Sequence, residues 1–129
     1  MTAPKKHTCS DCGKPNAVGQ ARLCPTCKRK HNKAAKEKAH DAYILKTYGI
    51  TGDQYRALYA AQGGKCAICK VATGKRKRLA VDHDHKTGEV RGLLCGSCNH
   101  RLLGAAHESV ELLQRAIDYL NSPPARLTL

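Results

Sequence analysis

The sequence predicts a small α+β protein whose fold depends on bound metal. Three observations support this: eight cysteines in four C-x2-C pairs, an aromatic content of 4%, and a hairpin-like segment flanked by helical segments. Aromatic rings normally supply much of a core's buried area, so a chain of 129 residues without Trp or Phe has a thin core. Such chains usually need disulfides or metal ions to fold.

The spacing of the cysteines favours metal over disulfides. Two thiolates of a C-x2-C knuckle can bind the same tetrahedral zinc, so sequential pairing of the four knuckles predicts two structural Zn²⁺ sites. The expected ligands are Cys9, Cys12, Cys24 and Cys27 in the first site, and Cys66, Cys69, Cys95 and Cys98 in the second. Interleaved knuckles and disulfide-bonded or redox-active cysteines are the alternatives.

The hydropathy of the sequence indicates neither a membrane span nor a secretory signal. No run approaches the ~18 apolar residues of a membrane span. Residues 1–7 lack the apolar region of a secretory signal. Together with the expected zinc sites, these features predict a reduced, cytoplasmic compartment and no membrane partner.

A net charge of +13, from 23 Lys and Arg against 10 Asp and Glu, indicates a polyanionic partner, most often nucleic acid. Charge alone does not separate a nuclease from a packaging protein. The basic residues concentrate in two stretches, whose plainer interpretation is a solvated helix and a solvated loop. The candidate DNA contacts are Lys28, Arg29, Lys30, Lys33, Lys75, Arg76, Lys77, Arg78 and Arg91.

Three domains are predicted along the chain. Residues 1–27 form a four-cysteine zinc ribbon with turns at Gly and Pro. Residues 28–48, rich in Ala and Lys and free of Gly and Pro, form a basic linker helix that Gly49 ends. Residues 49–129 form the third domain. In it, helices are expected at about 52–62 and 107–121.

A β-hairpin is expected in the middle of the third domain. The segments LAVDHDH and EVRGLLC read as two strands joined by residues 86–88, and CGSCNHRLL continues from the last knuckle into a short helix. The hairpin therefore lies between the two knuckles of the second zinc site.

This hairpin carries the residues best suited to chemistry. Four adjacent side chains can bind metal or transfer protons: Asp82, His83, Asp84 and His85. Asn99 directly follows Cys98, so one zinc fixes both the base of the hairpin and the position of this amide. The plainer interpretation is a polar hairpin with exposed histidines, and Asn99 as a helix N-cap.

Phosphodiester hydrolysis needs a base near neutral pH and a cation that neutralises charge on the phosphoryl and leaving oxygens. An imidazole suits the first task, and a hard divalent cation held by oxygen ligands suits the second. His83 is the candidate base, His85 can contact the phosphate, and Asp82 and Asn99 offer oxygens. Adjacent residues of a regular strand face opposite ways, so a shared site requires irregular geometry near 82–84 or a position at the hairpin's rim.

The segments CAIC and VDHDHKTGEVRGLLCGSCN closely resemble the phage recombination endonuclease VII branch of the HNH nucleases. The lead-in YGITGDQYRALYAAQGG is similar too, and the resemblance covers about residues 48–121. It implies a ββα-metal (His-Me finger) core with structural zinc. By the same resemblance, Asp82 and Asn99 bind a catalytic Mg²⁺ or Mn²⁺, His83 is the general base and His85 assists at the phosphate.

The expected function is therefore a metal-dependent HNH endonuclease of phage or prophage origin that nicks or cuts DNA in the host cytoplasm. Its substrates are expected among duplex, nicked or branched DNA, with phage packaging or recombination proteins as further partners. Leu102 stands where the junction-resolving member has an acidic residue, which argues against junction resolution. The rivals are a non-catalytic zinc-finger DNA-binding or packaging protein and an RNA-binding protein.

Overall fold

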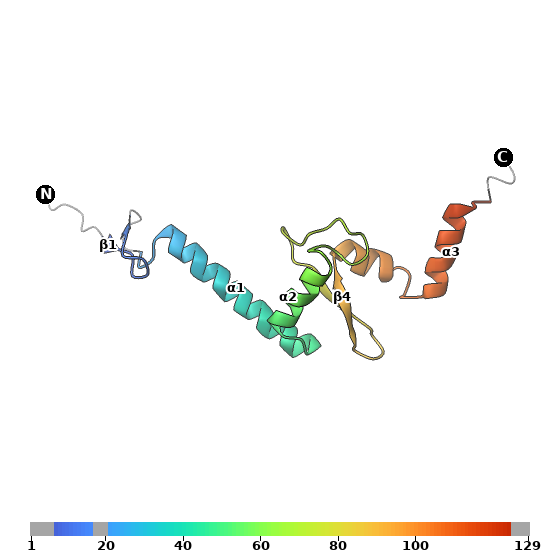
Figure 1. The fold of residues 1–129 in the computed structure, drawn as a ribbon, viewed down its shortest axis with the longest axis horizontal. Coiled ribbons are helices and arrows are strands. Elements are labelled where there is room, and N and C mark those ends of the chain that lie inside the picture. Colours follow the sequence, from blue (N-terminus) through green and yellow to red (C-terminus); the bar gives the residue numbers. More distant parts are fainter. Residues whose placement is uncertain (1–6, 17–20, 125–129) are drawn as a thin grey trace. The chain divides into compact units, whose positions relative to one another are not determined.

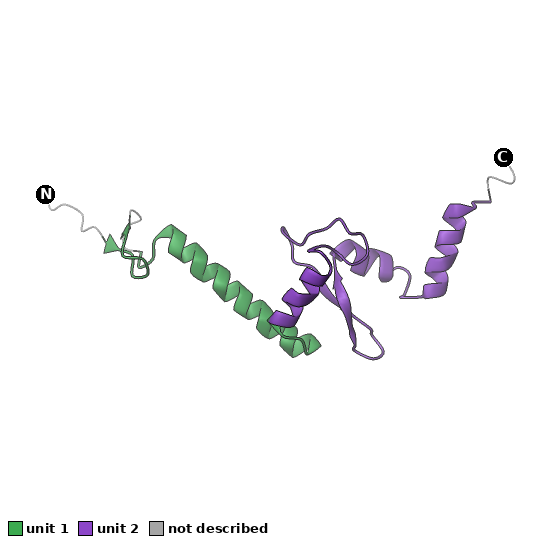
Figure 2. Cartoon of the chain, in the orientation of Figure 1, with its two compact units in different colours: residues 1–52 green, residues 53–129 purple. Residues whose placement is uncertain are grey.

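The computed structural model describes residues 7–16 and 21–124. The chain divides into two compact units, Met1–Gly52 and Asp53–Leu129, which are coloured separately in Figure 2. Each unit is described by itself. Among the described residues, no helix combines the length and apolar character needed to cross a membrane.

The first unit contains a short antiparallel ribbon and a long helix. Strands β1 (His7–Thr8) and β2 (Pro15–Asn16) form the ribbon, and α1 spans Pro25–Tyr48 (Figure 1). The helix begins three residues before the predicted start at residue 28. The reason is local, because Cys24 accepts a hydrogen bond from the backbone N–H of Cys27 and proline occupies the first turn.

Gly49 ends α1, as predicted. It adopts a left-handed conformation with φ of 71°, and its N–H donates to the carbonyl of Leu45 at 3.0 Å. Within α1 only Cys27 and Ile44 are buried. The rest of the helix therefore presents its lysine-rich surface to solvent.

The second unit is built around an antiparallel hairpin of β3 (Ala80–His83) and β4 (Val90–Leu94). Helix α2 (Gly52–Ala61) precedes it, and a π-helix, η1 (Ser97–Leu103), and α3 (Val110–Asn121) follow (Figure 1). The predicted hairpin is confirmed, with shorter strands than expected. The predicted short helix is present as a π-helix. Helix α3 starts three residues after the expected 107, because Ser109 caps it by accepting from the N–H of Leu112.

The core of the second unit lies between α2, the cysteine knuckles and the hairpin. Its buried apolar residues are Tyr55, Cys66, Leu79, Val81, Leu93, Leu94, Cys98 and Ala106. Polar side chains of α2 and of the turn that follows it reinforce this core. The Tyr55 hydroxyl donates to the carbonyl of Leu79 at 2.7 Å, and the Gln62 amide both donates to and accepts from the backbone of Leu93, at 2.9 and 2.8 Å. A thin core is thus supplemented by side chain to backbone hydrogen bonds.

Candidate active site and metal centres

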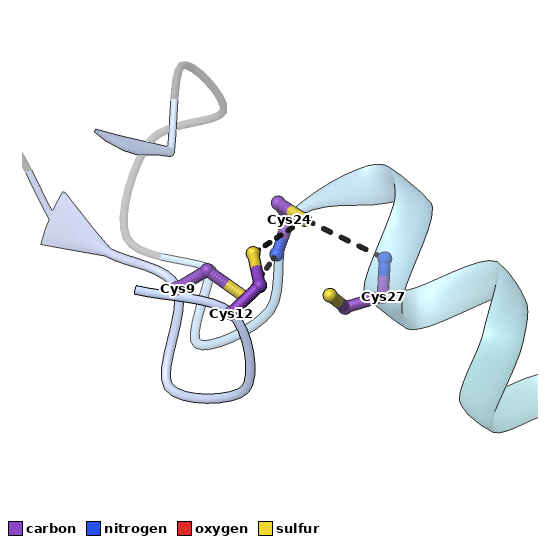
Figure 3. A group of neighbouring side chains, drawn as sticks. All are labelled: Cys9, Cys12, Cys24 and Cys27. Atoms are coloured by element: carbon purple, nitrogen blue, oxygen red, sulfur yellow. Dashed lines mark hydrogen bonds between the residues drawn. The ribbon is translucent and has the colours of Figure 1, made fainter. Parts of the chain in front are cut away.

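The first cysteine cluster joins Cys9, Cys12, Cys24 and Cys27 (Figure 3). The four sulfur atoms lie within 4.8 Å of one another, and the Sγ atoms of Cys12 and Cys24 are 3.8 Å apart. A tetrahedral zinc with Zn–S bonds of about 2.3 Å holds its sulfurs about 3.8 Å apart. The geometry and the all-sulfur donor set therefore fit a structural zinc ion.

Hydrogen bonds tune the thiols of this first cluster. Backbone N–H groups, chiefly that of Cys24, lower the pKa of Cys9 to about 6. The side chain of Asp11 has the opposite effect and raises the pKa of Cys27. These contacts favour the thiolate at Cys9 and the thiol at Cys27, and a bound zinc ion would favour the thiolate at both.

The second cluster joins Cys66, Cys69, Cys95 and Cys98, also within 4.8 Å. The Sγ atoms of Cys69 and Cys95 are 4.0 Å apart, and the N–H of Cys95 donates to the Sγ of Cys66 at 3.3 Å. Burial opposes ionisation of Cys66, but N–H donors led by Cys95 outweigh it and lower its pKa to about 6. Burial raises the pKa of Cys98 to about 12.

Sequential pairing of the knuckles is confirmed, and all eight cysteines are free thiols. Within the described residues, these two clusters are the groups of three or more Cys, His, Asp or Glu side chains close enough to share a metal. The chain is therefore compatible with two structural zinc ions.

The second cluster fixes the segments that flank the hairpin. Cys95 directly follows β4, and Cys98 lies in the first turn of η1. Asn99 comes next and is half-buried. Its N–H donates to the carbonyl of Cys95 at 2.9 Å, and its carbonyl accepts from Gly104 at 3.2 Å. The knuckle thereby sets the backbone position of Asn99.

Asp82 is buried in β3, with 6% of its surface exposed. Its carboxylate accepts from the Nε of Arg91 at 2.7 Å and from its Nη2 at 3.0 Å. The hydrogen bonds of Arg91 to Asp82, and after them those to Glu108, raise the pKa of Arg91 above its already high ordinary value. The contact compensates the charge of a carboxylate that is largely removed from water.

The hairpin register shifts at this position. Asp82 pairs with Gly92, whereas His83 pairs with Val90, so Arg91 is an extra residue in β4. The hairpin is therefore irregular beside Asp82 and His83, with the extra residue in β4. It lets Arg91 reach across to Asp82 within the same hairpin.

The two candidate catalytic histidines lie against each other. The ring centroids of His83 and His85 are 4.9 Å apart, and the ring planes meet at 81°. His83 is half-buried and His85 is exposed. Asp84 between them braces the turn, because its Oδ1 accepts from the N–H groups of Lys86 and Thr87 at 2.7 and 2.9 Å. Those two donors, that of Thr87 first, lower the pKa of Asp84.

Glu108 is a site residue that sequence reasoning missed. Its Oε1 lies 2.8 Å from the Nδ1 of His85 and accepts from the Nη2 of Arg91 at 3.1 Å. Its Oε2 accepts from the Nη1 of Arg91 at 3.3 Å. The contacts therefore run from Asp82 through Arg91 and Glu108 to His85. No sequence motif marks this acid. Residue 108 falls in the segment 107–121, which was expected to be an ordinary helix.

A cleft of about 620 Å³ opens at this network. It is lined by Asp84, His85, Lys86, Arg91, Gly104, His107, Glu108 and Val110. Arg91, predicted to contact phosphate, is paired with two carboxylates here. The other predicted DNA contacts, in residues 28–33 of α1 and in the 75–78 loop, are exposed, and the loop lines a second hollow of about 390 Å³ beside Cys95.

A family model described as recombination endonuclease VII matches residues 41–122, well over half of the chain. The chain belongs to the recombination endonuclease VII family. The "Gene 59 protein" of Mycobacterium phage D29 is 51% identical over 127 residues, which covers 94% of this chain and 77% of that protein. The "Gene 59 protein" of Mycobacterium phage L5 is 49% identical over the same shares. No solved structure matches the chain.

Membership of the endonuclease VII family indicates a DNA-cleaving nuclease, and the relatives named above are phage proteins. The resemblance read from the hairpin motif is thus confirmed. The family match also covers every residue of the contact network around Asp82 and Glu108.

Proposed function

We propose that this endonuclease VII family member is a metal-dependent HNH endonuclease that hydrolyses DNA phosphodiester bonds by nicking or cutting. One observation carries the proposal. The rings of His83 and His85 lie 4.9 Å apart, and the buried carboxylate of Asp82 is linked to His85 through Arg91 and Glu108. Two imidazoles of this kind supply a proton acceptor and a phosphate contact in one place.

His83 is assigned as the general base that takes a proton from the attacking water. An imidazole ordinarily titrates near neutral pH, which suits this task. His85 is assigned to the phosphate, since 71% of its side chain is exposed. The attack is expected in line with the leaving 3′-oxygen, so that the products carry 5′-phosphate and 3′-hydroxyl ends.

Asp82 and Asn99 are proposed to hold one catalytic Mg²⁺ or Mn²⁺. An ionised carboxylate offers about four acceptor positions. Arg91 uses two of those of Asp82, which leaves positions for a cation. Magnesium sites commonly consist of one or two protein oxygens completed by water. When bound, the cation would neutralise charge on the phosphoryl and leaving oxygens.

The cysteine clusters are proposed to bind structural zinc, and the basic surfaces to bind the DNA backbone. Lysines and arginines on exposed elements contact phosphates independently of sequence. The residues assigned to this role are Lys28, Arg29, Lys30, Lys33, Lys75, Arg76, Lys77, Arg78 and Arg91. Action in the host cytoplasm and contact with packaging or recombination proteins remain predictions.

The decisive test is a plasmid-nicking assay of the zinc-loaded chain with and without Mg²⁺ or Mn²⁺. His83→Ala is expected to reduce nicking about 100-fold or more, because general bases contribute about 10²–10⁴ in rate. Its binding to the same plasmid should persist. His100→Ala, which removes an exposed imidazole from η1, is the matched control and should nick normally. If the His83→Ala protein cuts as well as the wild type, His83 is not the general base.

The charge of +13 and the two cysteine clusters also fit a non-catalytic zinc-finger DNA-binding or packaging protein. That alternative predicts tight plasmid binding without nicking in either metal. A competition gel with RNA and DNA tests the RNA-binding alternative, which requires RNA to displace DNA.

A further inference from the structure

Glu108 binds two residues of the candidate active site at once. One carboxylate oxygen lies 2.8 Å from the Nδ1 of His85 and 3.1 Å from the Nη2 of Arg91. Three-quarters of the Glu108 side chain is shielded, with 25% exposed. The acid therefore lies inside the contact network and not at its margin.

The backbone around Glu108 adopts an unusual conformation to place this carboxylate. His107 and Glu108 have φ of 50° and 56°, in the left-handed region that L-residues with side chains rarely adopt. Hydrogen bonds from the N–H groups of these two residues to Gly104 and Leu103, at 3.1 and 3.0 Å, hold the loop at the end of η1. Conformations of this kind cluster at functional sites, where the surroundings impose them.

Electrostatic attraction to DNA does not account for Glu108. A carboxylate in a cleft that meets phosphates weakens binding to a polyanion, and the chain otherwise carries a net charge of +13. A functional role of Glu108 must therefore act through its contacts with His85 and Arg91.

We propose that Glu108 is a positioning residue that fixes the ring of His85 for work on the DNA phosphate. The proposal rests on the nuclease function proposed above. A neutral imidazole carries one N–H, and the partner of one ring nitrogen determines which nitrogen carries it. Because Nδ1 lies 2.8 Å from the Glu108 carboxylate, we expect Nδ1 to carry the proton, which leaves Nε2 for the substrate. Glu108 also accepts from Nη1 and Nη2 of Arg91, and Nη2 donates to Asp82 as well.

The test uses the full zinc-loaded chain and compares Glu108→Ala with Glu108→Gln. Glutamine keeps an oxygen that accepts from Nδ1–H but has no charge, whereas alanine removes the acceptor. Glu89→Ala removes the same charge from an exposed position of the hairpin that carries His85 and is the matched control. The first readout is ¹⁵N NMR of the histidine rings at about pH 8, where a free imidazole is neutral. His85→Gln identifies the signals.

The wild type, Glu108→Gln and Glu89→Ala are expected to show the Nδ1–H tautomer of His85. Glu108→Ala is expected to shift toward the Nε2–H tautomer that free histidine prefers. This measurement needs no activity. A wild-type His85 that carries its proton on Nε2 overturns the proposal, even if the alanine variant fails to fold.

The second readout is nicking at saturating plasmid. Loss of a partner that orients a metal-binding histidine typically costs about 10–100-fold in activity, and we expect kcat of Glu108→Ala to fall by a similar factor. Its KM for DNA should stay constant or decrease, because a negative charge has left the cleft. A merely structural role predicts weaker DNA binding instead. Unchanged kcat in Glu108→Ala, with the tautomer lost, overturns the proposed role in the reaction.

Failure of the nuclease function itself would look different. In that case the wild type nicks no DNA in either metal, while the tautomer measurement still decides whether Glu108 positions His85.

Discussion

Arg91, the extra residue of the β-bulge, donates hydrogen bonds to both carboxylate oxygens of Asp82, at 2.7 and 3.0 Å. The carboxylate is 8% exposed and the arginine side chain 35% exposed. The pair thus couples the irregular point of the hairpin to the neutralisation of a buried acid.

Arg91→Ala is expected to destabilise the second unit by about 1–3 kcal/mol, because the buried carboxylate loses its charged partner. The measurement is urea unfolding of the zinc-loaded chain. Asp82→Asn in the Arg91→Ala background should recover part of the loss, since the unpaired charge is gone. Equal costs of Arg91→Ala in both backgrounds would show that the two side chains are not energetically coupled.

Metal analysis of the purified chain is expected to give two zinc ions. Cys66→Ala should lose one zinc and the hairpin with it, because Cys66 is fully buried and accepts from the backbone of Cys95. Cys9→Ala should lose one zinc but keep the hairpin signals, since its cluster belongs to the other unit. NMR of the backbone amides distinguishes the two. A chain without zinc and with intact disulfides contradicts the assignment.

Binding of Arg76 to a DNA phosphate predicts a change in salt dependence. Each lost phosphate contact lowers the slope of log K against log salt by about 0.9. Arg76→Ala should show this decrease in binding titrations at several salt concentrations. Arg115→Ala, on α3 outside the proposed basic surfaces, removes the same charge and should leave the slope unchanged. Identical slopes for both variants would place Arg76 outside the DNA interface.

The first turn of α3 should respond to acid. Hydrogen bonds from its own N–H and then from the Ser109 hydroxyl lower the pKa of Glu111 below its ordinary value of 4.5. Because the pKa is depressed in the folded state, the stabilisation is present above pH 4.5 and is lost as the pH falls below it. The Cα chemical shifts of residues 110–113 should lose helical character in that range. Chemical shifts that stay constant on acidification would contradict a stabilising role of the Glu111 carboxylate in the first turn of α3.

Ser109→Ala should mimic the acid effect at neutral pH, because it removes the acceptor for the N–H of Leu112. The expected cost to the helix is about 1 kcal/mol. Ser122→Ala, beyond the other end of α3, is the control.

The sequence predicted the features that depend on short-range patterns. C-x2-C spacing determined how the cysteines group, and alternation with a Gly-containing turn located the hairpin. Its strand bounds were less well predicted, because Asp84 starts the turn by binding the N–H groups of Lys86 and Thr87. That local competition shortens β3 by two residues at its end.

Short-range sequence patterns did not predict the contacts between residues that are far apart in the sequence. The bulge at Arg91 depends on which residue of β3 faces it, and Glu108 approaches His85 through two left-handed residues that no composition rule marks. Arg91 illustrates the limit best. Its charge indicated a phosphate contact, which stays a prediction, but no pattern indicated that Asp82 and Glu108 pair with it.

The amide of Gln62 has a consequence for behaviour at high concentration. Two-stranded sheets expose unpaired backbone groups that can template association with other chains. Here one side chain, from the turn that follows α2, binds both the N–H and the carbonyl of Leu93, as a third strand would. A side chain at position 92 would meet the Gln62 oxygen at 3.1 Å, so glycine keeps that approach open. The apolar strand β4 is thereby shielded along this edge from intermolecular strand addition and aggregation.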